Sequence, residues 1–419
     1  MSHTPAHKSA TSSEPRSHGR TEVAIWWITF LNSIGTGVLW NGLGFVTQRD
    51  LKFSEVETTM LFLASGGVYT IAALASGRTV RTLSRRMSPR SLLVALLLLQ
   101  AAASPLVYIG IGSVGIVLTV LVTSATGALL WPIVESYVSG GRSGDGMRRA
   151  IGRWCIVWMA AVSAALLLMA PLMRHGAGDA LDARFAVFAV GPLSLVSMLA
   201  LPWVPRVPGA HVDEHAPVPP GYRAQLASAR VLLPASYLLV GALSPILPYV
   251  LTSIDVAPAA QTPLTATWLI VRLGAVAMLA HVAFWHGRWS SLFVGGALLA
   301  SGFALVVAAP ALWSVTVGLS LFGIGHGVIY YAALYYALRV GSAGVDAGGT
   351  HEALIGVGYV AGPGAAMAGA LLGGGPWIVG TTWICLGVLV LPAVLPWWRE
   401  IRARRATPAT PEIPASTPQ

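Results

Sequence analysis

The stretch RVPGAHVDEHAPVPPGYRAQLASAR, residues 206–230, is one of the few polar segments in an otherwise apolar sequence. Proline fixes φ and removes a backbone donor, and the segment has no apolar run that could be buried. We therefore expect residues 205–230 to form a semi-stiff, non-helical connector. On either side lie two blocks of nearly equal length, residues 23–204 and 231–398, each with about six long apolar runs. The connector thus predicts a membrane protein built as two similar halves.

The composition agrees with a polytopic membrane protein. Only 10% of the 419 residues are charged and 55% are hydrophobic, whereas soluble proteins carry about 25% charged residues. Apolar runs of about 20 residues recur along the chain, and each is long enough to cross the hydrocarbon core as a helix. An all-α protein with twelve transmembrane helices is therefore expected. The predicted spans lie near residues 23–46, 55–76, 91–110, 113–138, 151–173, 185–204, 231–253, 262–285, 289–309, 312–337, 352–373 and 376–398.

The basic residues predict the orientation of these spans. Only Arg49, Lys52, Arg174 and Arg184 fall in the loops of one side and Arg272 lies within a span, which leaves 21 of the 26 Lys and Arg for the other side. Because basic residues concentrate in cytoplasmic loops, we expect both termini in the cytoplasm and the protein in the cell (inner) membrane. Residues 1–22 and 399–419 are expected to be disordered cytoplasmic tails.

Several classes of function are disfavoured by the same residues. The net charge of +10 comes from arginines in short loops, which is the distribution of a membrane protein and not of a nucleic-acid groove. Cys155 and Cys385 both lie in apolar runs, so neither a disulfide framework nor a metal site is indicated. The sequence has no nucleotide-binding loop and no clustered catalytic dyad. We expect no cofactor and no enzymatic activity.

The two halves repeat each other weakly. TGALLWPIVESYVS (126–139) aligns without a gap with HGVIYYAALYYALR (326–339), at an offset of 200 residues. Residues 150–152 match residues 354–356, and FVTQRD (45–50) matches VLTSID (250–255). Three matches in the same order and at similar offsets indicate a duplicated six-helix unit.

This organisation resembles the major facilitator superfamily of secondary transporters, which are built as six plus six helices with a long inner linker. The loop GRTVRTLSRR (77–86) resembles that family's signature G-x-x-x-D-[RK]-x-G-R-R through Gly77, Arg85 and Arg86. Arg81 stands where the family has Asp, which weakens the usual gate salt bridge. The resemblance covers residues 22–398 and implies a pseudo-symmetric pair of bundles that transports by alternating access.

Arg272 is the clearest candidate for a role in transport. It lies near the middle of the eighth predicted span, and a charge at the bilayer midplane must be paired or line a wet cavity. Trp268, one turn away on the same face, can hold the guanidinium by a cation–π contact. Arg272 is expected either to bind an anion or coupling ion or to bond structurally between helices.

His326 is a second candidate, near the centre of the tenth predicted span, with Tyr330 on the same helical face. Imidazole titrates near neutral pH, so His326 could bind solute or relay a proton. A neutral histidine bonded across a helix interface is the alternative. Among acids, Glu135, Asp50 and Asp255 are the other candidates for proton coupling.

A cytoplasmic gate is expected near the inner ends of the spans. Glu135 lies about one turn from the end of the fourth span, three residues after the kink-forming Pro132, with arginines nearby. An inner-gate salt bridge, a proton-coupling carboxylate and a solvated acid are the alternatives for Glu135. Glu352 is its counterpart at the start of the eleventh span, where a helix N-terminus favours a carboxylate. The expected gate residues are Glu135, Arg153, Arg85, Arg86 and Glu352.

The family resemblance implies further solute contacts, because spans 1, 4, 7 and 10 line the central cavity in related transporters. Asn32 and Thr36 share a face of the first span, and Thr123 and Trp131 share a face of the fourth. These four residues would line the cavity, although polar side chains also join membrane helices. The sequence Gly358-x₃-Gly362-Pro363 resembles a motif of drug/proton antiporters, but it lies in span 11 where that family has it in span 5.

These features predict a monomeric secondary transporter for a small anionic or polar solute, coupled to protons and surrounded by membrane lipid. A drug-efflux antiporter is one alternative. A receptor or scaffold that kept the fold without moving solute is the other.

Overall fold

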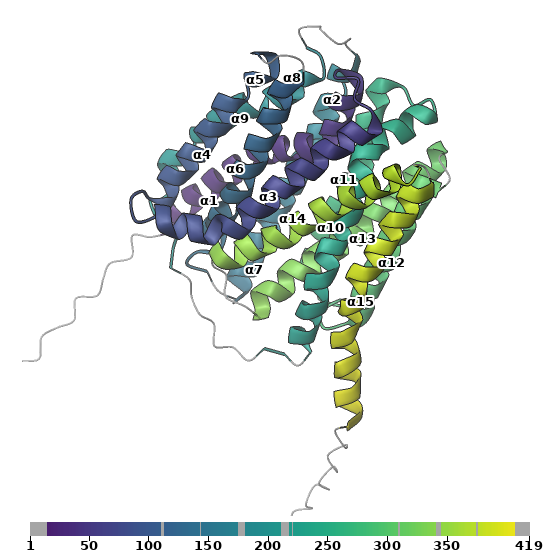
Figure 1. Ribbon diagram of the computed structural model, residues 1–419. Helices are drawn as coiled ribbons and strands as arrows, with labels where there is room; N and C mark the ends of the chain where they lie inside the picture. Colours follow the sequence, from purple (N-terminus) through teal and green to yellow (C-terminus); the bar gives the residue numbers. More distant parts are fainter. Residues whose placement is uncertain are drawn as a thin grey trace, which may run out of the picture.

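The computed structural model describes residues 15–109, 113–142, 144–174, 181–210, 218–219, 221–308, 311–340, 345–373 and 376–406, and it contains no strand within them. Figure 1 shows a bundle of long, roughly aligned helices. In the first half these are α1 (Pro15–Gly37), η1 (Val38–Gly42), α2 (Leu43–Arg49), α3 (Glu55–Leu83), α4 (Pro89–Ala103), α5 (Leu106–Ile109), α6 (Val114–Ser139), α7 (Gly144–Met169), η2 (Leu172–Arg174), α8 (Arg184–Phe188), α9 (Val190–Met198) and η3 (Leu201–Trp203). In the second half they are α10 (Tyr222–Ser253), α11 (Pro258–His281), α12 (Trp289–Ala308), α13 (Leu312–Val340), α14 (Val345–Leu371) and α15 (Pro376–Ala406).

The predicted spans correspond to these helices in order. Eleven described helices are long and apolar enough to cross a membrane, and the segment Arg184–Met198 is a shorter apolar helix in the place of the sixth span. That span is broken between α8 and α9, because Pro192 has no N–H to donate to the carbonyl of Phe188. The prediction of one continuous helix over residues 185–204 is therefore wrong, although the position of the span is right.

The predicted connector and tails are shorter than expected. Helix α10 begins at Tyr222, so residues 222–230 are helical and the prediction of a non-helical segment up to residue 230 is wrong there. The last proline of the connector is Pro220, and Gly221 then caps the helix with φ of 85°, a conformation that favours glycine. Helix α1 starts at Pro15 and α15 runs to Ala406, so parts of both predicted tails are helical too.

The first span contains a π-helical turn, η1, between α1 and α2. Such a turn inserts a residue into the helical repeat and is frequent at functional sites. Here both Trp40 and Asn41 face the same central cavity, although they are consecutive residues. One glycine precedes the turn and another is its last residue, where α7 packs closely. A Cβ on Gly37 would meet Ala165, and one on Gly42 would meet Met169.

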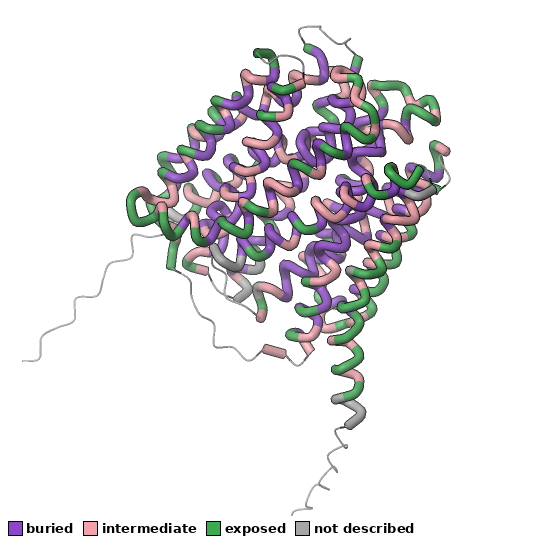
Figure 2. The backbone as a smooth tube through the Cα atoms, viewed as in Figure 1, coloured by how far each residue is buried: buried purple, intermediate pink, exposed green. Residues whose placement is uncertain are grey.

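The two ends of the bundle are named by their residues. The linker side holds the ends of α3 and α6 and the starts of α10 and α14; the Asp50 side holds the ends of α2 and α10. Figure 2 shows buried residues in the interior of the bundle and exposed residues along its periphery and along α15. Many of the exposed side chains are apolar, for example Ile71, Leu74 and Ile384, as a lipid-facing surface requires.

Helices from opposite halves pack directly against one another, chiefly α3 against α14 and α7 against α11. Glycines bring α3 and α14 together, because a Cβ on Gly66 would overlap the carbonyl oxygen of Tyr359 and one on Gly356 would overlap Thr70. Small residues permit such close backbone approach between membrane helices. These contacts enclose the space in which the candidate site lies.

Candidate functional site

A cavity lies between the two halves, and its wall comes from both. The centre of a water-sized sphere can move through about 60 Å³ of it, which is enough space for a few water molecules. Arg272 and Glu352 are the charged residues of the lining, with Ser33, Thr36 and Asn41 as polar neighbours. The rest of the wall is mostly aromatic, formed by Trp40, Tyr69, Trp131, Trp154, Trp158, Tyr237, Trp268, Tyr330 and Tyr359.

Arg272 points into this cavity, and its side chain is enclosed by aromatic rings. The guanidinium carbon lies 4.7 Å from the ring centroid of Trp158 and 4.8 Å from that of Tyr330. Trp268 is 5.9 Å away, so the predicted cation–π contact is present but is the longest of the three. Cation–π contacts gain strength when the pair is desolvated, and Arg272 is only 3% exposed.

The hydrogen-bonding capacity of Arg272 is largely unused by the described residues. One Nη2–H donates to the hydroxyl of Tyr237 at 3.3 Å. The buried Nε has no partner among the described side chains and backbone groups. Because a guanidinium offers five N–H donors in a fixed fork, its free edge is suited to a carboxylate or phosphate. The structure thus places a desolvated cation with vacant donors at a cavity wall.

Two carboxyl groups from opposite halves meet near the linker side of the cavity. The carboxyl group of Glu135 on α6 reaches α14, where a Cβ on Gly348, one turn before Glu352, would lie 2.5 Å from Glu135 Oε2, and the side chains of Glu135 and Glu352 interact there. The hydroxyl of Tyr69, on α3, donates a hydrogen bond to Glu352 Oε2. Gly348 makes room for this contact, because a Cβ there would press on Glu135 Oε2. The buried Oε1 of Glu135 has no partner among the described residues.

A stacked aromatic pair crosses the same interface. The rings of Trp40 and Tyr359 lie 3.9 Å apart with an interplanar angle of 8°. Tyr69 meets both rings edge-on, at 5.5 and 6.1 Å, and Tyr237 meets Tyr359 at 5.1 Å. Trp40 and Tyr69 belong to the first half, whereas Tyr237 and Tyr359 belong to the second. The halves are therefore joined through the cavity wall by ring contacts.

The four residues that the resemblance assigned to the cavity gather around a smaller polar space in the first half. Asn32, Thr36, Thr123 and Trp131 line it together, and Thr36 and Trp131 also line the main cavity. Asn32 donates to the carbonyl of Ile28 at 2.8 Å and to Ser197 at 3.1 Å. Thr123 donates to the carbonyl of Thr119. The polar groups of Asn32 and Thr123 are therefore engaged within the first half.

His326 lies behind the cavity wall. Its ring is fully buried and packs against Tyr237 at 4.8 Å and Trp268 at 5.6 Å, and it is not part of the lining. Tyr330, on the same helical face, does line the cavity. Neither ring nitrogen of His326 has a hydrogen-bond partner among the described residues. The structure thus gives His326 neither the cross-helix hydrogen bond nor the direct solute contact considered from the sequence.

Contacts between the halves lie on both sides of the cavity. On the Asp50 side, Gln48 donates to Thr252 at 3.3 Å, and Tyr249 bonds Thr58 at 2.9 Å. Tyr249 also donates to the carbonyl of Phe53 at 2.7 Å. On the linker side, Glu135 and Glu352 meet, and α3 packs tightly against α14. The two halves are therefore in contact on both sides of the cavity.

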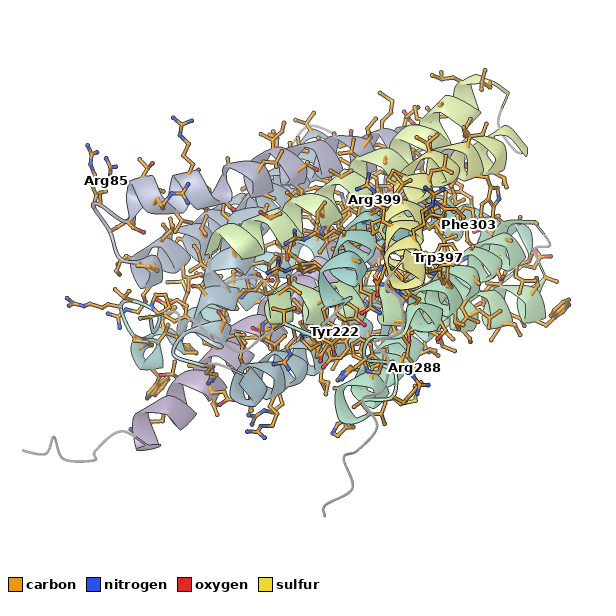
Figure 3. The ribbon with its side chains drawn as sticks, turned by 90° about the horizontal axis from the view of Figure 1, so that it is seen from below. Arg85, Tyr222, Arg288, Phe303, Trp397 and Arg399 are labelled. Carbon is orange, nitrogen blue, oxygen red and sulfur yellow. The ribbon has the colours of Figure 1, made fainter. Side chains whose placement is uncertain are left out.

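The gate that was expected from the sequence differs in its partners. Arg153 pairs with Glu22 at 3.5 Å and lies 5.8 Å from the ring of Trp26, so it does not pair with Glu135. The reason is geometric, because Arg153 points to α1 whereas Glu135 points to α14. Arg85 and Arg86 have exposed side chains in the turn after α3, and Figure 3 shows Arg85 projecting from the edge of the bundle.

Asp50 lies outside the membrane-spanning segments and takes part in a polar cluster on its own side. Its Oδ2 accepts a hydrogen bond from the amide of Arg184 at 2.9 Å, and Arg184 pairs with the buried Asp182 at 2.6 Å. Partial burial raises the pKa of Asp50, although the Arg184 amide opposes this effect. Asp50 is thus held in a surface network remote from the cavity lining. The described residues contain no group of three His, Cys, Asp or Glu that could hold a metal ion.

Sequence reasoning missed much of the aromatic wall. Trp154 and Trp158 stand one turn apart on α7, which is the fifth span, and were not among the expected site residues. Tyr69 of α3 and Tyr359 of α14 come from spans that were not expected to line the cavity. The signal in the sequence was the concentration of tryptophan and tyrosine within the spans, because these residues more often lie at membrane interfaces.

Comparisons with known proteins bear on the fold. No protein-family model matches the sequence, and no curated protein matches it. Among solved structures, a bacterial homolog of the human lysosomal transporter Spinster, in an inward-facing and unoccupied conformation, has a TM-score of 0.65 at 13% identity and covers 95% of this chain and 100% of its own. The human organic anion transporter TETRAN has a TM-score of 0.62 at 13% identity, over 91% of this chain and 99% of its own.

The fucose:proton symporter of E. coli gives a TM-score of 0.59 at 14% identity, over 91% of this chain and 99% of its own. Identities this low concern the arrangement of the helices, and these chains align along nearly their whole lengths. The fold predicted from the sequence is thereby confirmed: the chain has the two-bundle, twelve-span fold of the major facilitator superfamily transporters.

Proposed function

We propose that this protein is a secondary transporter that moves a small organic anion across the membrane by alternating access, with protons as the coupling ion. The observation that carries the proposal is Arg272, a buried cation in the cavity between the halves whose Nε has no partner among the described residues. A cavity at the interface of two bundles is the position from which rocking of the halves opens a site to either side.

The position of Arg272 favours an anionic solute over a cationic one. Removing the water shell of a guanidinium costs free energy unless an opposite charge or hydrogen bonds replace the lost hydration. Aromatic rings cover its faces, and one donor is bonded to Tyr237. The remaining N–H groups would make charge-assisted bonds to a carboxylate, whereas a lipophilic cation in this cavity would be repelled.

The structural relatives support an anionic solute and proton coupling. Proteins of this fold include an organic anion transporter and a proton symporter, as their names state. The chain itself offers two carboxyl groups near the cavity as proton carriers, the buried Glu352 and the half-buried Glu135. A proton gradient is therefore the driving force that we assign to it.

A binding screen followed by flux measurement tests the proposal. Purified protein is screened by thermal shift against aliphatic and aromatic carboxylates, phosphate esters and lipophilic cations, and the best ligand is then used for uptake into proteoliposomes. Because hydrogen bonds to a charged group contribute about 1.5–3 kcal/mol, Arg272→Ala is expected to lower uptake at least about tenfold at subsaturating solute.

Arg288→Ala serves as the matched control, since Arg288 is exposed in the turn immediately before α12. It should leave uptake within about twofold of the unaltered protein. A protonophore should abolish accumulation of the anion. Transport of cationic drugs alone, unchanged in Arg272→Ala, would identify a drug-efflux antiporter. Absence of flux for every ligand that binds would identify a receptor on the same fold.

A further inference from the structure

We propose that Glu135 and Glu352 hold a single proton between them and that this shared proton closes the linker side of the cavity. The inference rests on the alternating-access function proposed above and names the site at which its coupling proton binds. Each half of the molecule supplies one of the two carboxyl groups, so their contact exists only while the halves are together on that side.

The chemistry of the contact requires a proton. An ionised carboxylate accepts hydrogen bonds and cannot donate one, so two carboxyl groups bond each other only when one of them is protonated. If both carboxyl groups were ionised in this poorly hydrated space, the two negative charges would repel each other strongly. Glu352 is only 6% exposed, and water therefore offers the pair little screening in the closed state. The proton belongs to the pair and not to either residue alone.

The groups that face the pair leave it without a compensating cation among the described side chains. Tyr69 of α3 donates its hydroxyl proton to Glu352. The other titratable groups close to the two carboxyl groups are neutral near pH 7. They are Tyr237 of α10, Tyr330 of α13, Tyr359 of α14 and Cys155 of α7. His351, adjacent in α14, turns instead to the ring of Tyr330.

The cation of the proposed solute site lines the same cavity as one member of the pair. Arg272 lines the same cavity as Glu352, is nine-tenths buried and keeps Nε unpartnered. Its described hydrogen bond goes to Tyr237, and not to either carboxyl group. The cavity therefore presents a vacant cationic site on one wall and a proton-holding pair toward the linker side. A solute anion and a proton would occupy it without competing for the same atoms.

Opening of the linker side separates the two carboxyl groups and exposes each to water. The shared proton then leaves to water on that side, and both glutamates become carboxylates. Closing reverses the step and takes up one proton. Because the closed state binds one proton more than the open state, the ratio of closed to open molecules should fall up to tenfold for each unit rise in pH above the transition.

Distance measurements between spin labels test this without any solute. Cysteines are introduced at Thr82 on α3 and Arg339 on α13, which are exposed on the linker side, after Cys155 and Cys385 are replaced by alanine. Double electron–electron resonance on reconstituted protein from pH 5 to pH 9 should show a short distance at low pH and a growing long-distance population as pH rises. A distance distribution that does not change over this range would overturn the proposal.

Neutral variants identify the groups responsible. Glu135→Gln leaves an amide that bonds Glu352 without a shared proton, so the closed fraction should become independent of pH. Glu57→Gln is the matched control: it lies on the opposite side of the membrane in a capping box with Ser54 that glutamine also satisfies, and it should titrate like the parent. A Glu135→Gln variant that titrates like the parent would refute the assignment.

Tyr69→Phe provides a second variant if the first does not fold. It removes the hydroxyl that stabilises ionised Glu352, so the transition should move to higher pH while the pH dependence persists. A transition that stays at the parent pH or moves lower would contradict the assigned contact.

The two proposals fail separately. Closure that depends on pH in a protein without flux would remove only the transport proposal, and flux that depends on Arg272 without such closure would remove only this one.

Discussion

Arg272 shows how a charge can be stabilised within a membrane protein while its binding capacity is preserved. The rings of Trp158 and Tyr330 cover the guanidinium at 4.7 and 4.8 Å, and Tyr237 takes one donor. No carboxylate pairs with Arg272 among the described residues, so its charge remains available for an anion. A buried ion pair would have satisfied the arginine and removed this capacity.

His326 differs from Arg272 in that it offers nothing to the cavity. Because both ring nitrogens lack partners among the described residues, burial of this imidazole is costly. His326→Phe keeps the shape and removes the polar atoms, so the melting temperature should stay the same or rise. Uptake should remain within about twofold, measured in proteoliposomes. Loss of uptake in a variant that melts normally would show that the imidazole takes part in transport.

At this scale the sequence predicted which residues are unusual but not what they touch. Arg272 stands out because a charge within an apolar span is rare, and its neighbour Trp268 follows from helical spacing. The partner of Glu135 could not be predicted in the same way. Glu352 lies in the other half, and the contact depends on how α6 and α14 approach each other, which no local pattern encodes.

At the scale of elements, glycines determine how closely α3 and α14 can pack. A Cβ on Gly66 would overlap the carbonyl oxygen of Tyr359, whereas a Cβ on the adjacent Gly67 has nothing within 4 Å. Gly66→Ala should therefore destabilise the protein by about 1–3 kcal/mol through overpacking. Gly67→Ala should stabilise it by up to about 1 kcal/mol through helix propensity alone.

The two alanine variants are compared by thermal unfolding in the same detergent and at the same scan rate, because unfolding of membrane proteins is commonly irreversible. Opposite shifts of the melting temperature are expected from these neighbouring residues. Equal shifts in one direction would mean that α3 and α14 do not meet at Gly66.

Hydropathy and turn residues predicted the order and approximate positions of the helices, because a span must hide its backbone from lipid regardless of its neighbours. The irregular parts were harder to predict. The break before α9 follows from Pro192, but the π-helical turn at Trp40 depends on packing against α7. The early start of α10 reflects the absence of proline from residues 221–233, so the last part of the polar connector is free to be helical.

At the scale of the molecule, the distribution of basic residues predicts how the protein sits in the membrane. We expect the linker side in the cytoplasm, since most Lys and Arg lie in its loops. In cells that carry variants without Cys155 and Cys385, a membrane-impermeant maleimide should label Lys52→Cys directly. It should label Arg85→Cys only after permeabilisation. The reverse pattern would invert the orientation and with it the side from which the shared proton enters.

The cationic wall and the carboxyl pair of the cavity together have an electrical consequence. In the closed protein without solute, the positive charge of Arg272 and the single negative charge of the pair cancel. A bound monovalent anion adds one negative charge, whose movement across the membrane couples to the voltage by about 2.3 kcal/mol per 100 mV. Voltage should therefore change the rate at which the loaded protein reorients, and a current would accompany the crossing of the anion.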